Sequence, residues 1–246
     1  MNINYTKQWV TIGSAVVMVT AASGMALPAQ AVQITANITA DNHYGLYYGQ
    51  SDGSRLSLVG RNEIDDIHVA DTIAPVPSIS CTGVFSWKCP EAWEFDADPG
   101  DYLYLAAWDE DLEQMWIGDI QFDDGRSLLS NTRDWEYAIA SGNNPGSGSL
   151  PSLAAISTEI ANASWATPKV SAPQGTMPWG TIAGISSTAE FVWHDTLSND
   201  SDSDRNYVIF RTTAPLVEES VPEPSVTLGL GLVALAGMLV GRRVIL

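Results

Sequence analysis

The chain has 246 residues and carries 11 Lys and Arg against 29 Asp and Glu, a formal net charge of −18. So acidic a chain has too few basic residues to neutralise a phosphate backbone, which excludes nucleic acid as a partner. Hydrophobic residues make up 45% of the chain, and part of that share is concentrated in two apolar segments at its ends. We therefore expect one globular domain between two terminal segments.

The N-terminal segment is typical of a secretory signal peptide. Lys7 precedes an apolar run over residues 10–27, and the triplet Ala29-Gln30-Ala31 then places small residues two apart. A membrane anchor is the alternative, but the run is rich in small residues and no charged stop follows it. The sequence therefore predicts that residues 1–31 are a signal peptide, with Ala29 and Ala31 marking the cleavage site.

The segment from Val32 to Ser220 predicts an all-β domain. Short stretches rich in β-branched and aromatic residues alternate with turn-forming residues, which favours an antiparallel β-sandwich. The expected strands are Gln33 to Thr39, Tyr44 to Gly49, Arg55 to Gly60, Ala92 to Phe95, Tyr102 to Trp108, Gln114 to Phe122, Ala189 to His194 and Tyr207 to Thr212. Both alternating positions of Tyr102 to Trp108 are apolar, as in a central strand. The tryptophans expected in the core are Trp93, Trp108, Trp116 and Trp193.

The opening of this segment resembles that of galactose-binding-domain-like jelly rolls. The stretch from Asp41 to Gly49 reads D-N-H-Y-G-L-Y-Y-G, although Gly49-Gln50 departs from the Asn-Gly turn of that family. Further matches in kind extend to the strand that ends near Arg211, so the resemblance implies a single jelly-roll domain. The family includes carbohydrate-binding modules and purely structural accessory domains, so this likeness does not fix the function.

One short helix is expected from Leu150 to Asn162, after a Gly-, Asn- and Ser-rich loop over residues 142–148. Ser149 can cap it, Pro151 lies in its first turn, and three apolar residues share one face: Leu153, Ile156 and Ile160.

Cys81 and Cys89 are the two cysteines of the chain and lie within the insertion from Pro75 to Pro90. In an exported chain a disulfide is the natural interpretation. A metal pair is the alternative, but no histidine stands nearby at ligand spacing.

Three alternate carboxylates, Asp200, Asp202 and Asp204, can wrap oxygen ligands around Ca²⁺. The stretch lacks the glycine and the distal glutamate of an EF-hand loop. A solvated acidic hairpin loop is the alternative that we favour.

The stretch from Gly49 to Gly53 matches the G-x-S-x-G pattern of hydrolases. A strand-like segment follows it, where a nucleophile elbow needs a helix, so we interpret it as a hairpin turn. The three histidines, His43, His68 and His194, are scattered, and surface or edge positions are their default expectation. The sequence therefore predicts no catalytic residue and a protein that is not an enzyme.

Trp87, in the cysteine loop, and Trp179 both lie between turn-forming residues. We expect these two rings to be the exposed ones and hence the candidate ligand-binding residues.

The C-terminal segment, residues 221–246, begins with Pro222-Glu223-Pro224, continues without a charge from Ser225 to Val240, and ends with Arg242, Arg243 and three apolar residues. This order resembles the PEP-CTERM sorting signal of exported bacterial proteins. The resemblance implies a transmembrane helix and processing by an exosortase, a membrane transpeptidase-like enzyme of Gram-negative bacteria that make extracellular polysaccharide. A plain C-terminal anchor is the alternative, but it leaves the Pro-Glu-Pro triplet unexplained.

The sequence as a whole predicts an exported protein of the cell surface, outer membrane or extracellular biofilm matrix of a Gram-negative bacterium. Its partners in export would be signal peptidase and exosortase, with a transient anchor in the inner membrane. The segment from Val32 to Ser220 holds 28 acidic and 8 basic residues, so an anionic polysaccharide would need divalent cations as bridges. Association with extracellular polysaccharide, with Ca²⁺ as a candidate cofactor, is the favoured function. The alternatives are a structural or adhesive surface protein without a discrete sugar site and, third, a polysaccharide-active enzyme.

Overall fold

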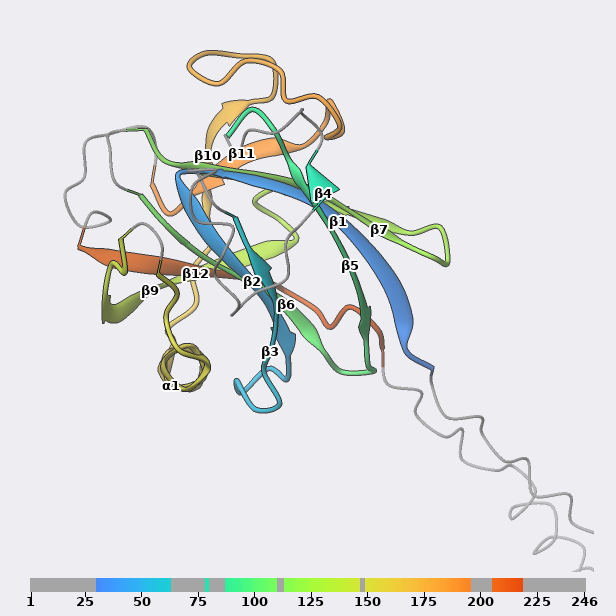
Figure 1. The fold of residues 1–246 in the computed structure, drawn as a ribbon, viewed down its shortest axis with the longest axis vertical. Helices are drawn as coiled ribbons and strands as arrows, with labels where there is room; N and C mark the ends of the chain where they lie inside the picture. The colour runs from blue at the N-terminus through green and yellow to red at the C-terminus, as the bar shows by residue number, and fades with distance from the viewer. Residues whose placement is uncertain are drawn as a thin grey trace, which may run out of the picture. The chain divides into compact units, whose positions relative to one another are not determined.

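The computed structural model describes residues 30–62, 78–79, 87–109, 113–146, 149–195 and 205–218. All of them belong to one compact unit, residues 28–220. They form two antiparallel sheets and one helix (Figure 1), which confirms the all-β prediction and is consistent with a β-sandwich. Among the described residues no helix is long and apolar enough to cross a membrane. The predicted signal peptide up to residue 29 and the predicted C-terminal helix lie outside them.

The larger sheet has seven strands. Six follow one another in the order β10 (Lys169–Pro173), β11 (Glu190–Trp193), β7 (Met115–Phe122), β1 (Val32–Asp41), β5 (Glu91–Ala97) and β4 (Ser78–Ile79), and β8 (Ser127–Leu129) pairs with β7. The smaller sheet has the order β3 (Ser57–Arg61), β2 (His43–Gly49), β6 (Tyr102–Trp108), β12 (Asn206–Thr212) and β9 (Trp135–Asn143). The central position of β6 confirms the prediction made from its apolar run.

The main core lies between the two sheets. Alternate residues of β1 supply one wall, because successive side chains of a strand point to opposite faces: Ile34, Ala36, Ile38 and Ala40 are all buried. The four tryptophans predicted for the interior are also buried, at 3% exposure or less: Trp93, Trp108, Trp116 and Trp193.

The outer face of the smaller sheet is covered by α1 (Leu153–Asn162). Ile156 and Ile160 are buried against aromatic and small residues of β2, β6, β9 and β12. The helix begins later than predicted, because the side chain of Ser152, not Ser149, accepts the backbone N–H of Ala155 at 3.2 Å. Ser152 thereby satisfies one of the N-terminal amides that the helix itself leaves open.

The outer face of the larger sheet carries a second apolar layer. Residues 174–189, between β10 and β11, fold back on the sheet and bury Trp179, Ile182 and Ile185 against β7 and β11. The contacted side chains include Met115, Ile117 and Phe191. Two auxiliary clusters therefore flank the main core, one outside each sheet.

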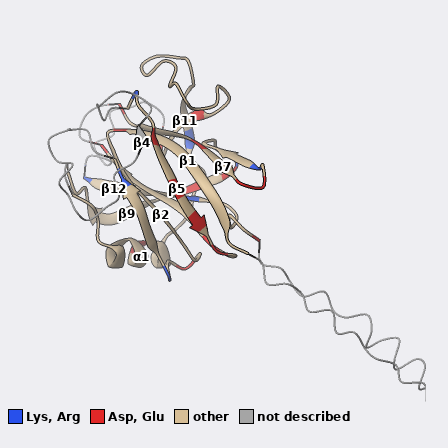
Figure 2. Cartoon of the chain, turned by 45° about the vertical axis from the view of Figure 1, so that its right-hand side comes forward, with Lys and Arg blue, Asp and Glu red and all other residues tan. Residues whose placement is uncertain are grey.

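The predicted hairpin turn is confirmed. Residues 50–56 join β2 to β3, so the G-x-S-x-G stretch is a hairpin connection without a helix after it. Gly53 has φ +78° and lies so close to α1 that the hydroxyl of Ser157 donates to its carbonyl at 2.7 Å. The turn at Asp123 and Asp124 joins β7 to β8. Figure 2 shows acidic residues at this turn and along β5.

Candidate functional site

Trp179 is not exposed, contrary to the prediction. It is 4% accessible, its indole N–H donates to Asp41 Oδ2 at 2.7 Å, and its ring centre lies 5.0 Å from that of Phe191. The turn-forming residues around Trp179 do shape a loop, but that loop covers the apolar outer face of the larger sheet. Trp179 is therefore part of the packing and unsuited to stacking on a ligand.

Trp87 is half-buried and packs on the edge of the same outer cluster as Trp179. The Lys88 ammonium lies 4.7 Å from the centre of its ring. Cys89, two residues on, is buried and disulfide-bonded. Cys81 lies outside the described residues, so its pairing with Cys89 stays a prediction.

Most of the other predicted site residues also fall outside the part of the chain that the structure describes. These are Ala29 of the cleavage site, the carboxylates Asp200, Asp202 and Asp204, and the sorting-signal residues Pro222, Glu223, Pro224, Arg242 and Arg243. Ala31 is described and exposed. The described residues hold no group of three His, Cys, Asp or Glu side chains that could bind a metal ion. The Ca²⁺ site therefore stays a prediction.

His43 and His194 are buried, at 2% and 6% exposure, where the sequence predicted surface or edge positions. His43 stacks on Trp108, with ring centres 5.5 Å apart and planes 16° from parallel. His194 lies 5.9 Å from the ring of Tyr137 and 6.0 Å from that of Trp193. Both imidazoles thus take part in aromatic packing at the ends of strands.

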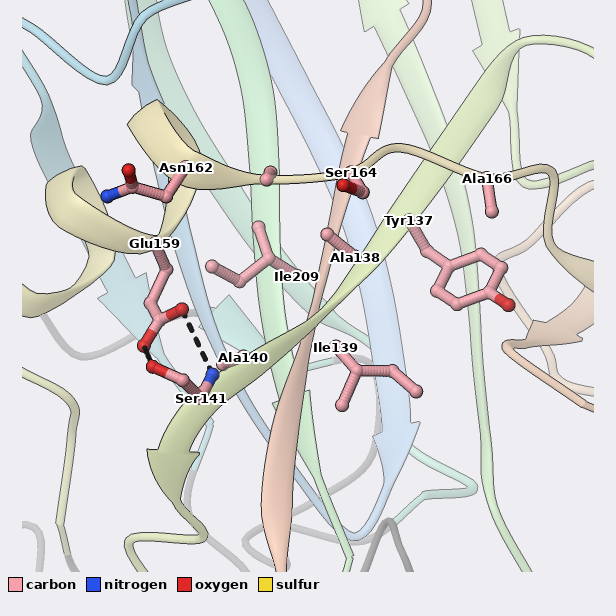
Figure 3. A pocket seen from close by; sticks show the side chains of 11 residues that line it. Tyr137, Ala138, Ile139, Ala140, Ser141, Glu159, Asn162, Ser164, Ala166 and Ile209 are labelled. Atoms are coloured by element: carbon pink, nitrogen blue, oxygen red, sulfur yellow. Dashed lines mark hydrogen bonds between the residues drawn. The ribbon is translucent and has the colours of Figure 1, made fainter.

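A pocket of about 490 Å³ lies between α1 and the edge strand β9 (Figure 3). Small-molecule sites have volumes of about 300–1,000 Å³. Its floor consists of aliphatic side chains on the outer face of the smaller sheet: Ala138, Ala140 and Ile209. Its rim is polar and comes from α1, from the chain that follows α1, and from the end of β9: Glu159, Asn162, Ser164 and Ser141.

Glu159 fastens the helix to β9 at one side of this pocket. Its carboxylate accepts the Ser141 backbone N–H at 3.0 Å, the Ser141 hydroxyl at 2.6 Å and the Gly142 N–H at 3.1 Å. Both carboxylate oxygens are thereby held in place. Since Glu159 is the one carboxylate among the lining residues, this pocket lacks the pair of facing carboxylates that glycoside hydrolysis uses.

The chain after α1 closes the opposite side. Ala166 forms a two-way backbone bridge with Tyr137, whose N–H donates at 2.8 Å and whose carbonyl accepts at 2.9 Å. Successive residues of an edge strand direct their peptide groups alternately toward the neighbouring strand and away from it. The outward peptide groups of Tyr137 bond to Ala166, and the outward N–H of Ser141 bonds to Glu159. By the same alternation, the N–H and C=O of Ile139, which lines the pocket between them, face the pocket.

A second pocket, of about 310 Å³, lies where the segment after β12 passes β8. Arg126 lies over the Phe122 ring, 4.4 Å from its centre, and donates to the Leu216 carbonyl at 3.1 Å. Leu216 and Val217 are buried in the main core. Arg126 and these apolar side chains hold residues 213–218 on the sandwich, so the second pocket is part of a structural contact.

No protein-family model, curated protein or solved structure matches this chain. The features of this chain that bear on its function are the pocket between α1 and β9 and the terminal segments with their predicted signals. Sequence reasoning missed this pocket because β9, which supplies most of it, was not among the expected strands. The one available signal was the expected helix, on whose polar side Glu159 and Asn162 fall.

Proposed function

We propose that this chain is an exported surface or matrix protein of a Gram-negative bacterium, sorted by an exosortase, whose β-sandwich associates with extracellular polysaccharide. The terminal segments support export and sorting through their resemblance to a signal peptide and to a PEP-CTERM signal. The two packed antiparallel sheets suit the finer proposal of a galactose-binding-like jelly roll. In this proposal the protein is a binding protein and not an enzyme.

The observation that carries the binding proposal is the pocket between α1 and β9. A sugar ring has apolar C–H faces and a polar circumference, so it fits an aliphatic floor bordered by hydroxyl, amide and carboxylate groups. Ala138, Ala140 and Ile209 supply such a floor, and Ser141, Asn162 and Ser164 supply such a border. The acidic composition adds a condition, because an anionic polymer would be repelled unless Ca²⁺ bridges the two.

The test is retention of the purified full chain on a panel of polysaccharides, including the polymer of the host, with Ca²⁺ and with chelator. We expect retention of at least one polymer, and a Ca²⁺ requirement for the acidic ones alone. Trp87→Ala should weaken retention if the half-buried ring also contacts the polymer. Tyr48, an equally half-buried aromatic residue on β2 that does not line the pocket, provides the matched control as Tyr48→Ala.

If the wild-type protein is retained on no polymer, with Ca²⁺ or with chelator, the proposal is wrong. The structural or adhesive alternative would then stand, and the burial of Trp179 favours it, since one of the two aromatic candidates for a sugar platform belongs to the interior. Release of reducing sugars from a retained polymer would instead support the enzymatic alternative.

A further inference from the structure

The peptide groups of Ile139 are the open hydrogen-bonding positions of β9 within the pocket. Tyr137 is paired with Ala166, and Ser141 is bound by Glu159. Among the described residues nothing pairs with the outward N–H and C=O of Ile139, which the strand places side by side. An edge strand that exposes such groups is a template for a hydrogen-bonding partner.

A strand of several residues does not fit this gap. A strand that adds to an edge needs several outward-facing residues in succession. Here the nearest outward-facing residues already have partners: Tyr137 pairs with Ala166, and the Ser141 N–H donates to Glu159. A single trans amide does not fit either, because its N–H and C=O point in opposite directions and cannot both reach the peptide groups of one residue.

Two adjacent hydroxyls do fit. Each hydroxyl both donates and accepts, so one can accept from the Ile139 N–H while its neighbour donates to the Ile139 C=O. The apolar face of the same ring would then lie over Ala138 and Ala140, with the exposed Ser164 at the rim as a partner for a further hydroxyl. The Asn162 amide points away from this floor and donates to the Thr158 carbonyl at 2.8 Å. The Glu159 carboxylate at the rim disfavours an acidic sugar by like-charge repulsion.

We propose that the pocket between α1 and β9 binds one neutral hexopyranose residue through a pair of adjacent hydroxyls that bond to the Ile139 peptide groups. This inference rests on the proposed polysaccharide association and names its site and its sugar class. In this proposal the acidic residues outside the pocket do not contact the sugar ring.

Saturation-transfer NMR on the full chain tests the sugar class. The probes are methyl α-D-glucopyranoside, its 3-deoxy analogue, which has no adjacent pair of free hydroxyls, and glucuronic acid. We expect transfer to the neutral glycoside and at least a fivefold smaller signal for each of the other two. Equal signals for the glycoside and its 3-deoxy analogue would overturn the proposal.

Ala138→Leu tests the site, because the longer side chain fills the floor without adding a polar group. Its matched control is Ala161→Leu on the exposed side of α1, outside the pocket. We expect Ala138→Leu to lose the signal of the neutral glycoside and Ala161→Leu to keep it. Because Ala138→Leu could also disturb the sheet, Ser164→Phe, an exposed rim change, should block the pocket independently.

The outcomes separate this inference from the proposed function. If polymer retention persists at wild-type strength in both pocket variants, the pocket is not the site, although the polysaccharide association stands. If wild-type protein retains no polymer and transfers no saturation to the glycoside, both proposals are wrong.

Discussion

The hydroxyl of Tyr44 donates to the Glu91 carboxyl at 3.0 Å, from one sheet to the other. The Trp93 indole N–H in turn donates to the Tyr44 oxygen at 2.7 Å. All three side chains are at most 3% exposed. A carboxyl group at this depth is disfavoured in its charged form, because the interior solvates the ion poorly. Burial accordingly raises the pKa of Glu91 from its ordinary value of 4.5 to about 8, although the Tyr44 hydroxyl opposes this rise.

The raised pKa of Glu91 predicts a pH-dependent stability. Between pH 4.5 and about 8 the unfolded chain has released a proton that the folded chain retains. The free energy of unfolding therefore falls with rising pH through this window, by about 1.4 kcal/mol per pH unit from this group. Glu91→Gln keeps an acceptor for Tyr44 and cannot ionise, so its urea unfolding should depend less on pH than that of the wild type. Glu94→Gln, an exposed change on the same strand, should leave the slope unaltered.

The helix cap supplies a prediction with a control in the same loop. Ser152→Ala removes the acceptor of the Ala155 N–H and should lower the free energy of unfolding by about 1 kcal/mol. Ser149→Ala, at the position that the sequence favoured, should change it by less than about 0.5 kcal/mol. Urea unfolding followed by tryptophan fluorescence measures both. Equal effects of the two changes would place the cap elsewhere.

Trp179 should contribute to stability through its hydrogen bond as well as through its packing. Trp179→Phe keeps an aromatic ring but removes the donor to Asp41 Oδ2, and should cost about 1–3 kcal/mol. Trp87→Phe, at the half-buried edge of the same cluster, should cost less. The same urea titration compares them, and a larger loss for Trp87→Phe would contradict the buried position of Trp179.

Gly60 marks a close approach between β3 and the Trp93 ring. A Cβ atom at this position would lie 2.0 Å from Trp93 Cζ3, so the ring would have to move away from its hydrogen bond with Tyr44. Gly60→Ala should therefore lower stability by about 1–3 kcal/mol. The double variant Gly60→Ala, Trp93→Phe should lose less than the sum of the two single losses, since the smaller ring makes room. Additive losses would show that the clash is relieved in another way.

The strands that were correctly predicted are those with a strong local pattern. Tyr102 to Trp108 is apolar throughout and coincides with β6, and the expected segments that begin at Gln33 and Tyr207 differ from β1 and β12 by at most two residues at either end. The strand β9 was missed because Glu136, Ser141 and Gly142 dilute its apolar pattern. Its edge position tolerates such residues, since tertiary partners satisfy them: Glu136 accepts from Arg211 at 2.6 Å, and Ser141 donates to Glu159.

The sequence by itself determined the class of this protein: an acidic chain, antiparallel β-structure with one short helix, and terminal segments that resemble export and sorting signals. These features follow from composition and from local periodicity, which each segment carries alone. Only the tertiary structure decided that Trp179 is buried, that Glu91 lies in the core, and that α1 and β9 leave a pocket between them. The physical reason is that the burial of a side chain, and the hydrogen bonding of an edge strand, depend on which distant segment packs against that strand. A short window of sequence contains the strand or the distant segment, but not both.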